Sequence, residues 1–243
     1  MNKGTEFRLI RSFNQSASIN MAIDKALVTA FETDSKPILR VYTWEKSFTV
    51  GISQDPVSYA RRYLEYNNNY AKRMTGGGIL FHGHDLSYSL VLPPKLLEGF
   101  NVKQTYEKIC SFLLAFYQSL GLNAKYAKDV EEIVLSKSDF CQVGYEAYDI
   151  IVNGVKIGGN AQKWAKKIIF QHGSIPIYSV NEQKELGSSL EDMGINISYE
   201  EAIEKLIDAF EKTFEVELKD SNLNEKENEK FQKLVKDIND SKI

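Results

Sequence analysis

The chain is poor in cysteine: its 243 residues include only two, Cys110 and Cys141. Two cysteines are too few for the disulfide framework of a small secreted domain. A reducing, intracellular setting is therefore expected, and both thiols should be free there. A free thiol can act as a nucleophile once its pKa is lowered.

The chain also lacks a basic surplus and a long apolar run. Thirty Lys and Arg residues stand against 33 Asp and Glu residues, which gives a net charge of −3. A nucleic-acid binder usually carries an excess of basic residues, and a membrane-spanning helix needs about 20 apolar residues in succession. The start of the chain, residues 1–8, is polar and unlike a signal peptide. We therefore expect a cytoplasmic protein with no nucleic-acid or membrane partner.

The remaining composition is typical of a globular domain, with 43% hydrophobic and 26% charged residues. Helical and strand patterns alternate irregularly, which predicts an α+β fold with mixed β-sheets flanked by helices. An Asn153-Gly154 pair between two apolar runs predicts a β-hairpin. Helical patterns cover 18–31, 59–66, 101–120 and the segment after Ser198, and strand patterns cover 39–42, 48–52, 79–81, 86–92 and 168–178. We expect a catalytic domain over 1–220, followed by a charged helix or tail over 221–243.

All three histidines fall in two glycine-bearing segments. His82 and His84 follow the run Gly76-Gly77-Gly78, and His172 precedes Gly173. Consecutive glycines allow a ligand to approach the backbone closely and expose N–H groups toward an anion or a carbonyl oxygen. A plain turn beside a surface arginine, Arg73, would explain the first segment equally well.

The two cysteines differ in their surroundings. Cys110 lies among apolar residues of a predicted helix, which indicates a small core residue. Cys141 lies in a polar, loop-like segment and is the candidate nucleophile. Its thiol would need a nearby cation or donor, and Lys156, Lys163, Arg73 or a histidine could supply one. Lys156 stands two residues before a glycine pair, although an ordinary lysine at a strand edge would fit that position as well.

Other chemistries fit less well. His82, His84, His172 and Cys141 could together bind zinc, but no familiar zinc spacing is present, so we predict no metal. The nucleophile elbow of the serine hydrolases and the P-loop of nucleotide-binding proteins are both missing.

Several blocks of residues resemble the biotin/lipoate protein ligase and transferase family, and within it the octanoyl-[acyl carrier protein]:protein octanoyltransferases of the lipoate-ligase-like type. The run Asp85-Leu86-Ser87-Tyr88-Ser89 and the position of Cys141 are similar to these transferases. Gly78, Gly83 and Asn160 depart from the usual residues. The blocks that carry the resemblance are 20–27, 40–54, 73–82, 156–162 and 171–175.

The resemblance implies a biotin/lipoate protein ligase-like catalytic domain. It also implies an octanoyltransferase of lipoate biosynthesis, which moves an octanoyl chain from acyl carrier protein, through a thioester on Cys141, to a lysine of a lipoyl-domain protein such as the glycine-cleavage H protein. Lys156 would hold the thioester carbonyl, and no cofactor would be needed. The apolar chain would occupy a tunnel lined by 79–81 and the first helix. The residues implied in substrate binding are Arg73, Gly76, Gly77, Gly78, His82, Gly158, Gly159, Asn160 and His172.

Two alternatives remain open from the sequence. An ATP-dependent lipoate-protein ligase would form a lipoyl-adenylate with Mg²⁺. A protein that only binds lipoyl domains would keep the fold without the thiol chemistry.

Overall fold

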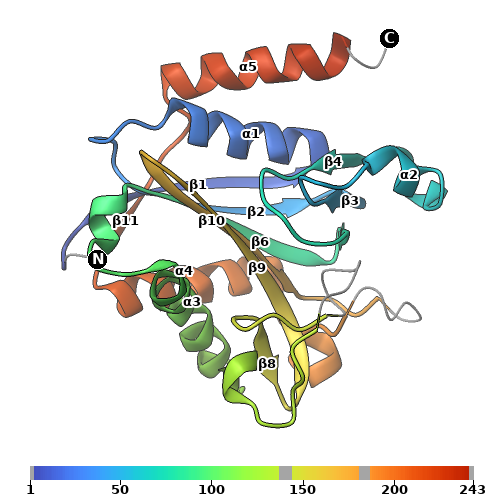
Figure 1. The fold of residues 1–243 in the computed structure, drawn as a ribbon, viewed down its shortest axis with the longest axis vertical. Helices are drawn as coiled ribbons and strands as arrows, with labels where there is room; N and C mark the ends of the chain where they lie inside the picture. The colour runs from blue at the N-terminus through green and yellow to red at the C-terminus, as the bar shows by residue number, and fades with distance from the viewer. Residues whose placement is uncertain (1–2, 137–143, 181–186, 241–243) are drawn as a thin grey trace.

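A computed structural model describes residues 3–136, 144–180 and 187–240. Its main feature is an eight-stranded mixed sheet with the strand order β11-β1-β2-β6-β10-β9-β8-β7. Helices cover both faces of this sheet (Figure 1). The predicted α+β fold with mixed sheets flanked by helices is therefore confirmed.

One half of the sheet is parallel because helices connect its strands. Strand β1 (Glu6–Gln15) leads into helix α1 (Ala17–Ala30) and then into β2 (Ile38–Trp44), which pairs in parallel with β1. Helix α4 (Tyr199–Phe214) leads in the same way to β11 (Glu217–Asp220), on the other side of β1. Parallel neighbours need such crossover connections.

The other half of the sheet is antiparallel. The predicted hairpin is confirmed, because Asn153 and Gly154 have φ values of 50° and 78° and join two paired strands. Positive φ at both turn residues matches the right-handed twist of the strands. The strands of this half are β6 (Asp85–Leu92), β10 (Ile168–Pro176), β9 (Val155–Ala165), β8 (Ile150–Val152) and β7 (Ala124–Tyr126).

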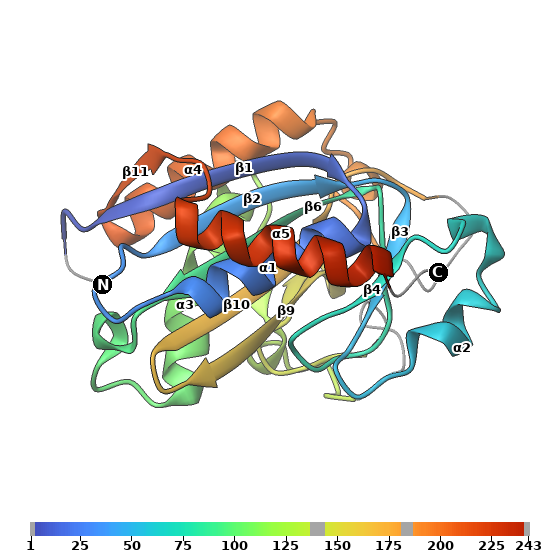
Figure 2. The same cartoon turned by 90° about the horizontal axis from the view of Figure 1, so that it is seen from above.

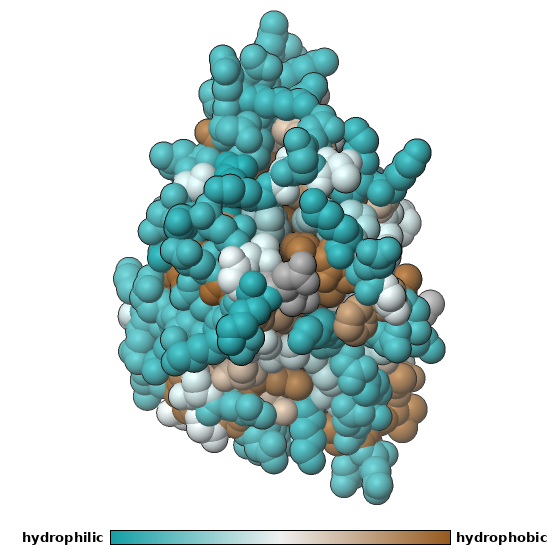
Figure 3. Space-filling model, turned by 90° about the vertical axis from the view of Figure 1, so that its left-hand side faces the viewer, coloured by the Kyte–Doolittle hydropathy of each residue, from teal (hydrophilic) through white to brown (hydrophobic). Residues whose placement is uncertain are grey.

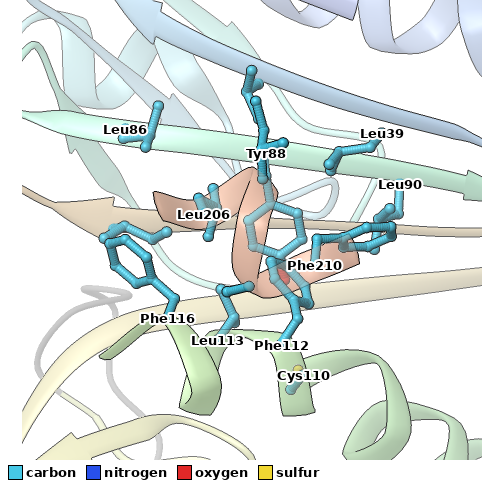
Figure 4. Close-up of a cluster of buried hydrophobic side chains, with 14 of the residues drawn as sticks. Leu39, Leu86, Tyr88, Leu90, Cys110, Phe112, Leu113, Phe116, Leu206 and Phe210 are labelled. Atoms are coloured by element: carbon cyan, nitrogen blue, oxygen red, sulfur yellow. The ribbon is translucent and has the colours of Figure 1, made fainter. Parts of the chain in front are cut away.

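The main core lies between this sheet and helices α3 (Val102–Ser119) and α4. Figure 4 shows Tyr88 of β6 pointing from the sheet toward Phe112 and Cys110 of α3. The opposite face of the sheet carries a smaller cluster with α1. Helix α5 (Glu225–Asp240) lies along α1 (Figure 2) and is anchored by an ion pair between Arg8 and Glu227.

A second sheet of three strands stands beside the first, in the order β4 (Tyr70–Lys72), β3 (Ser47–Val50) and β5 (Leu80–His82). The single helix predicted over 59–66 is wrong. The chain forms α2 (Pro56–Ala60) and a separate 3₁₀ helix, Leu64–Tyr66, which ends at Asn67 and Asn68 in the left-handed region. Further 3₁₀ helices are Pro94–Leu97, Ala127–Asp129 and Glu191–Met193.

Hydrophilic residues predominate on the face drawn in Figure 3, above all at the top, where α5 lies. No helix in the described part of the chain is both long and apolar enough to cross a membrane.

Candidate functional site

A cavity of about 890 Å³ collects most of the residues that the sequence singles out. Its walls come from the small sheet, the glycine turn, α1 and strands β9 and β10. The predicted site residues that line it are Arg73, Gly76, Gly77, Gly78, His82, Lys156, Gly159, Asn160 and His172.

Two predicted site residues are not placed in this cavity. Cys141 lies outside the described residues. Gly158 faces the packed interior, where an added Cβ would lie 2.8 Å from the carbonyl oxygen of Ser174.

The cavity wall is more polar than the sequence predicts. Helix α1 and strand β5 do contribute to it, through Met21 and Leu80. Many of the other lining side chains are polar or charged, so the expectation of an apolar tunnel is wrong for much of the wall.

Lys156 forms a buried ion pair with Asp149, and both residues line the cavity. Its Nζ lies 2.6 Å from Asp149 Oδ2 and donates to the carbonyl oxygen of Gly144 at 2.8 Å. Both side chains of the pair are about 5% exposed. Burial raises the pKa of Asp149, although the neighbouring Lys156 opposes the shift. Lys156 is therefore a buried cation facing a cavity, and not a solvated lysine at a strand edge.

Sequence patterns do not single out Asp149, but the hairpin could have identified it. The Asn153-Gly154 turn sets the pairing of Ile151 with Lys156. Asp149 lies two residues before Ile151, and diagonal neighbours across an antiparallel pair are within reach of long side chains. Asp149 is thus the carboxylate that the turn itself brings near Lys156.

The described residues that flank the segment of Cys141 both line the cavity. Ser136 and Gly144 lie on its wall, and Ser136 exchanges two backbone hydrogen bonds of 2.9 Å with Tyr145. Ser136 and Tyr145 are therefore neighbours, and Gly144 contacts Lys156.

Cys110 is a core residue, as the sequence predicts. It is fully buried, and its Sγ lies 3.3 Å from Gln171 Nε2. Burial raises the pKa of this thiol to about 12. A thiol with so high a pKa stays protonated near neutral pH and is a poor nucleophile.

Arg73 is buried behind the glycine turn, so its interpretation as a surface arginine is wrong. Its guanidinium donates to the carbonyl oxygens of Thr49 at 2.9 Å and Gly78 at 2.6 Å. The backbone of Gly51 also packs closely against the turn. A Cβ added to Gly51 would lie 2.1 Å from the carbonyl oxygen of Gly77, so only glycine fits at this position. Arg73 and Gly51 together fix the path of the glycine backbone along the cavity.

His82 is held from three sides. Its Nδ1 lies 2.9 Å from Asp85 Oδ2 and its Nε2 lies 2.9 Å from Thr49 Oγ1. The ring stacks on Trp44 with 3.7 Å between centroids. Burial would raise the pKa of Asp85, but His82, His84 and Ser174 together outweigh burial and lower it.

His172 is buried against the glycine turn, and its Nε2 lies 2.6 Å from Thr75 Oγ1. Burial, reinforced by the charges at Arg73 and His82, lowers the pKa of His172 to about 3. The ring is therefore neutral at pH 7.

This lowered pKa predicts that acid destabilises the protein through His172. Below pH ~6.5 the histidine of the unfolded chain binds a proton that the folded chain does not, so the free energy of unfolding falls as the pH falls, by up to ~1.4 kcal/mol per pH unit. His172→Gln should remove this contribution. Urea unfolding of both proteins from about pH 7 down to about pH 5 measures it, and equal slopes would contradict a neutral, buried His172.

The histidines do not gather into a metal site within the ranges that the structure describes. No group of three or more His, Cys, Asp or Glu residues there is close enough to hold a metal ion. His82 and His172 both line the cavity, but His84 does not.

Known proteins resemble this chain over most of its length. Residues 16–191 match the family model described as the lipoyl protein ligase A/B catalytic domain. Octanoyltransferase LipM of Exiguobacterium sp. (strain ATCC BAA-1283 / AT1b) is 33% identical over 192 residues, 74% of this chain and 68% of that protein. Octanoyltransferase LipM of Bacillus anthracis is 31% identical over 273 residues, 96% of this chain and 95% of that protein.

Solved structures show the same fold. A lipoate-protein ligase A bound with ATP superposes with a TM-score of 0.73 and 20% identity, covering 97% of this chain and 95% of that one. A bi-partite lipoate protein ligase from Thermoplasma acidophilum gives a TM-score of 0.73 and 21% identity, covering 97% and 93%. Since the family match spans well over half of the sequence, the chain belongs to the family of lipoyl protein ligase A/B catalytic domains.

Proposed function

We propose that this chain is an acyltransferase of protein lipoylation, which moves an octanoyl group through a thioester on Cys141 to a lysine of a lipoyl-domain protein. The observation that carries the proposal is the buried cation of Lys156, which faces the cavity beside both described ends of the Cys141 segment. The similarity to the LipM octanoyltransferases supports the octanoyl group as the cargo.

Chain length limits how far Cys141 can lie from Lys156. The Gly144 carbonyl accepts a hydrogen bond from Lys156 Nζ at 2.8 Å, and Cys141 precedes Gly144 by three residues. Three extended residues span at most ~11 Å. Cys141 is thus only three residues along the sequence from a residue that contacts Lys156, which supports the proposed role of its thiol as the nucleophile.

The first step transfers the acyl group to the enzyme. The Cys141 thiolate attacks the carbonyl carbon of the octanoyl thioester on acyl carrier protein, and the electron pair of the C=O bond moves to oxygen. When this oxyanion collapses, the bond to the carrier sulfur breaks, and the carrier leaves as a thiolate that takes up a proton. The Lys156 ammonium and the backbone N–H groups of the glycine turn stabilise the oxyanion.

The second step forms the amide. The neutral ε-amine of the acceptor lysine attacks the acyl-enzyme, the Cys141 thiolate leaves, and the new amide nitrogen loses a proton. A covalent intermediate lets one cavity serve two protein partners in turn. The donor is a thioester and is already activated, so the reaction needs no nucleotide.

Acyl carrier protein as donor and the glycine-cleavage H protein as acceptor are the specific partners we propose, in the cytoplasm. We also propose that residues 1–220 carry the catalysis and that 221–243 form an appended helix.

The test is to incubate the protein with octanoyl-acyl carrier protein and to measure its intact mass. We expect one octanoyl adduct that forms without ATP and that hydroxylamine removes, as it removes a thioester. An adduct that requires ATP and octanoate would instead indicate a ligase. No adduct under either condition would indicate a protein that only binds its partners.

A further inference from the structure

Three residues stand in a row across the middle of the main sheet. Gly173 of β10 is directly opposite Tyr88 of β6 on one side and Asn160 of β9 on the other. An added Cβ on Gly173 would lie 2.2 Å from Asn160 Oδ1 and 2.6 Å from Tyr88 Cε1. Because Gly173 has no side chain, Tyr88 can reach across β10 to β9. The Tyr88 hydroxyl donates a hydrogen bond to Asn160 Oδ1 at 2.6 Å.

The ring of Tyr88 is fixed by the core. It packs edge-on against Phe112 with 5.1 Å between ring centroids (Figure 4). Only its hydroxyl extends from the core toward the polar residues of β9. The position of the hydroxyl is therefore set by packing and does not depend on a ligand.

A chain of hydrogen bonds fixes which way each group in this region points. It begins at Trp164, whose indole N–H can only donate and does so to Gln162 Oε1 at 2.6 Å. The amide nitrogen of Gln162 then donates to Gln171 Oε1 at 2.8 Å.

The chain of hydrogen bonds continues from Gln171 through Tyr88 to Asn160, which lines the cavity. The amide nitrogen of Gln171 donates to the Tyr88 hydroxyl at 2.8 Å, so the single hydroxyl proton of Tyr88 is left for Asn160 Oδ1. Reversing either glutamine would bring two donors or two acceptors together. The carboxamide of Asn160 therefore has a defined orientation, with its oxygen toward Tyr88.

The other end of this carboxamide lacks an acceptor. Asn160 Nδ2 is shielded from water and has no hydrogen-bond partner among the residues that the structure describes. A buried donor without an acceptor is unfavourable and calls for an explanation. Asn160 lines the same cavity as Lys156, so a molecule bound there can bring the acceptor.

We propose that Asn160 Nδ2 donates a hydrogen bond to the carbonyl oxygen of the bound acyl thioester, and that Tyr88 and Gly173 are positioning residues for it. This inference rests on the function proposed above. An octanoyl chain carries no polar atom outside its thioester group, so the carbonyl oxygen is the one strong acceptor that it can offer. Asn160 and Lys156 then act on the same oxygen, one as a neutral donor and the other as a cation.

The test compares the wild-type protein with Asn160→Asp and Tyr88→Phe. Aspartate has the same shape as asparagine and can still accept from Tyr88, but it places an acceptor where Nδ2 was. We expect acyl-enzyme formation from octanoyl-acyl carrier protein to slow by at least about tenfold, the worth of one hydrogen bond. Tyr88→Phe should slow it in the same direction, and the two changes together should be less than additive.

A spectroscopic measurement separates this role from a structural one. With a ¹³C label at the octanoyl carbonyl, a hydrogen bond lowers the infrared stretching frequency of the acyl-enzyme. Asn160→Asp removes the Nδ2 donor and Tyr88→Phe removes the hydroxyl that orients it, so the frequency should rise in both variants. Tyr126→Phe is the matched control, since Tyr126 is a buried tyrosine that donates to the carbonyl of Glu107 at 2.8 Å and does not line the cavity. It should leave the rate and the frequency unchanged.

The outcomes distinguish the two proposals. The same frequency and rate in the wild type and in Asn160→Asp would overturn the assignment of Asn160 and leave the transferase function intact. A wild-type protein that forms no acyl-enzyme would overturn the transferase function and this inference with it.

Discussion

Replacing Cys141 by serine is expected to abolish octanoyl transfer, with a rate lower by roughly 10⁴- to 10⁶-fold, the cost of removing a covalent nucleophile. A serine hydroxyl stays protonated near neutral pH, whereas a thiol near a cation ionises. Intact mass after incubation with octanoyl-acyl carrier protein should show no thioester adduct. Transfer to a lipoyl domain should stop as well, because both steps use the same sulfur.

The second cysteine of the chain supplies the control. Cys110→Ala removes a thiol that is fully buried in the core, so it should lower the free energy of unfolding slightly and leave the octanoyl adduct unchanged. Persistent labelling of Cys141→Ser together with loss of labelling in Cys110→Ala would reverse the assignment of the two thiols.

Replacing Lys156 by methionine is expected to lower the transfer rate by about 10²- to 10³-fold, the effect of losing one strong donor to an oxyanion. Methionine keeps much of the length of lysine but removes both the charge and the N–H donors. The variant should also be less stable, since breaking a buried ion pair costs ~3–5 kcal/mol and Asp149 loses its 2.6 Å contact. Single-turnover kinetics and urea unfolding measure the two effects separately.

A second variant separates catalysis from stability. In Lys156→Met with Asp149→Asn, no charge is left buried without a partner, so much of the stability should return while transfer remains slow. Lys163→Met is the matched control, because Lys163 lies on the same strand, is exposed and does not line the cavity. If the double variant regained activity with its stability, Lys156 would be a structural residue only.

Much of the fold could be predicted from local patterns. Periodic apolar residues and end signals such as Ser198, whose side chain accepts from the backbone N–H of Glu201, locate α1, α3 and α4 nearly to the residue. Strands β4, β7 and β11 escaped prediction because each is short, contains a lysine and lacks the run of apolar residues that marks a strand. The break between α2 and the 3₁₀ helix after it also escaped, because Tyr59, Tyr63 and Tyr66 keep a near-helical spacing across it.

The sequence singles out many residues of the candidate cavity but not the contacts between them. The glycine turn, Lys156 and His172 could be singled out from their neighbours in the sequence, and the structure places them around one cavity. The neighbouring residues in the sequence do not indicate that the Arg73 side chain is buried and donates to the backbone of the glycine turn. They also do not indicate that Asp149 and Lys156 form a buried ion pair.

The sequence by itself determined the family, the types of the main helices, the hairpin at Asn153-Gly154 and the different characters of the two cysteines, because each depends on residues within a few positions of one another. Only the tertiary structure decided that His172 meets Thr75, 97 residues away along the chain, and that Tyr88 reaches Asn160 over Gly173. Such contacts depend on which strands become neighbours in the sheet. That order follows from burying the apolar surface of the whole chain at once, and no short segment encodes it.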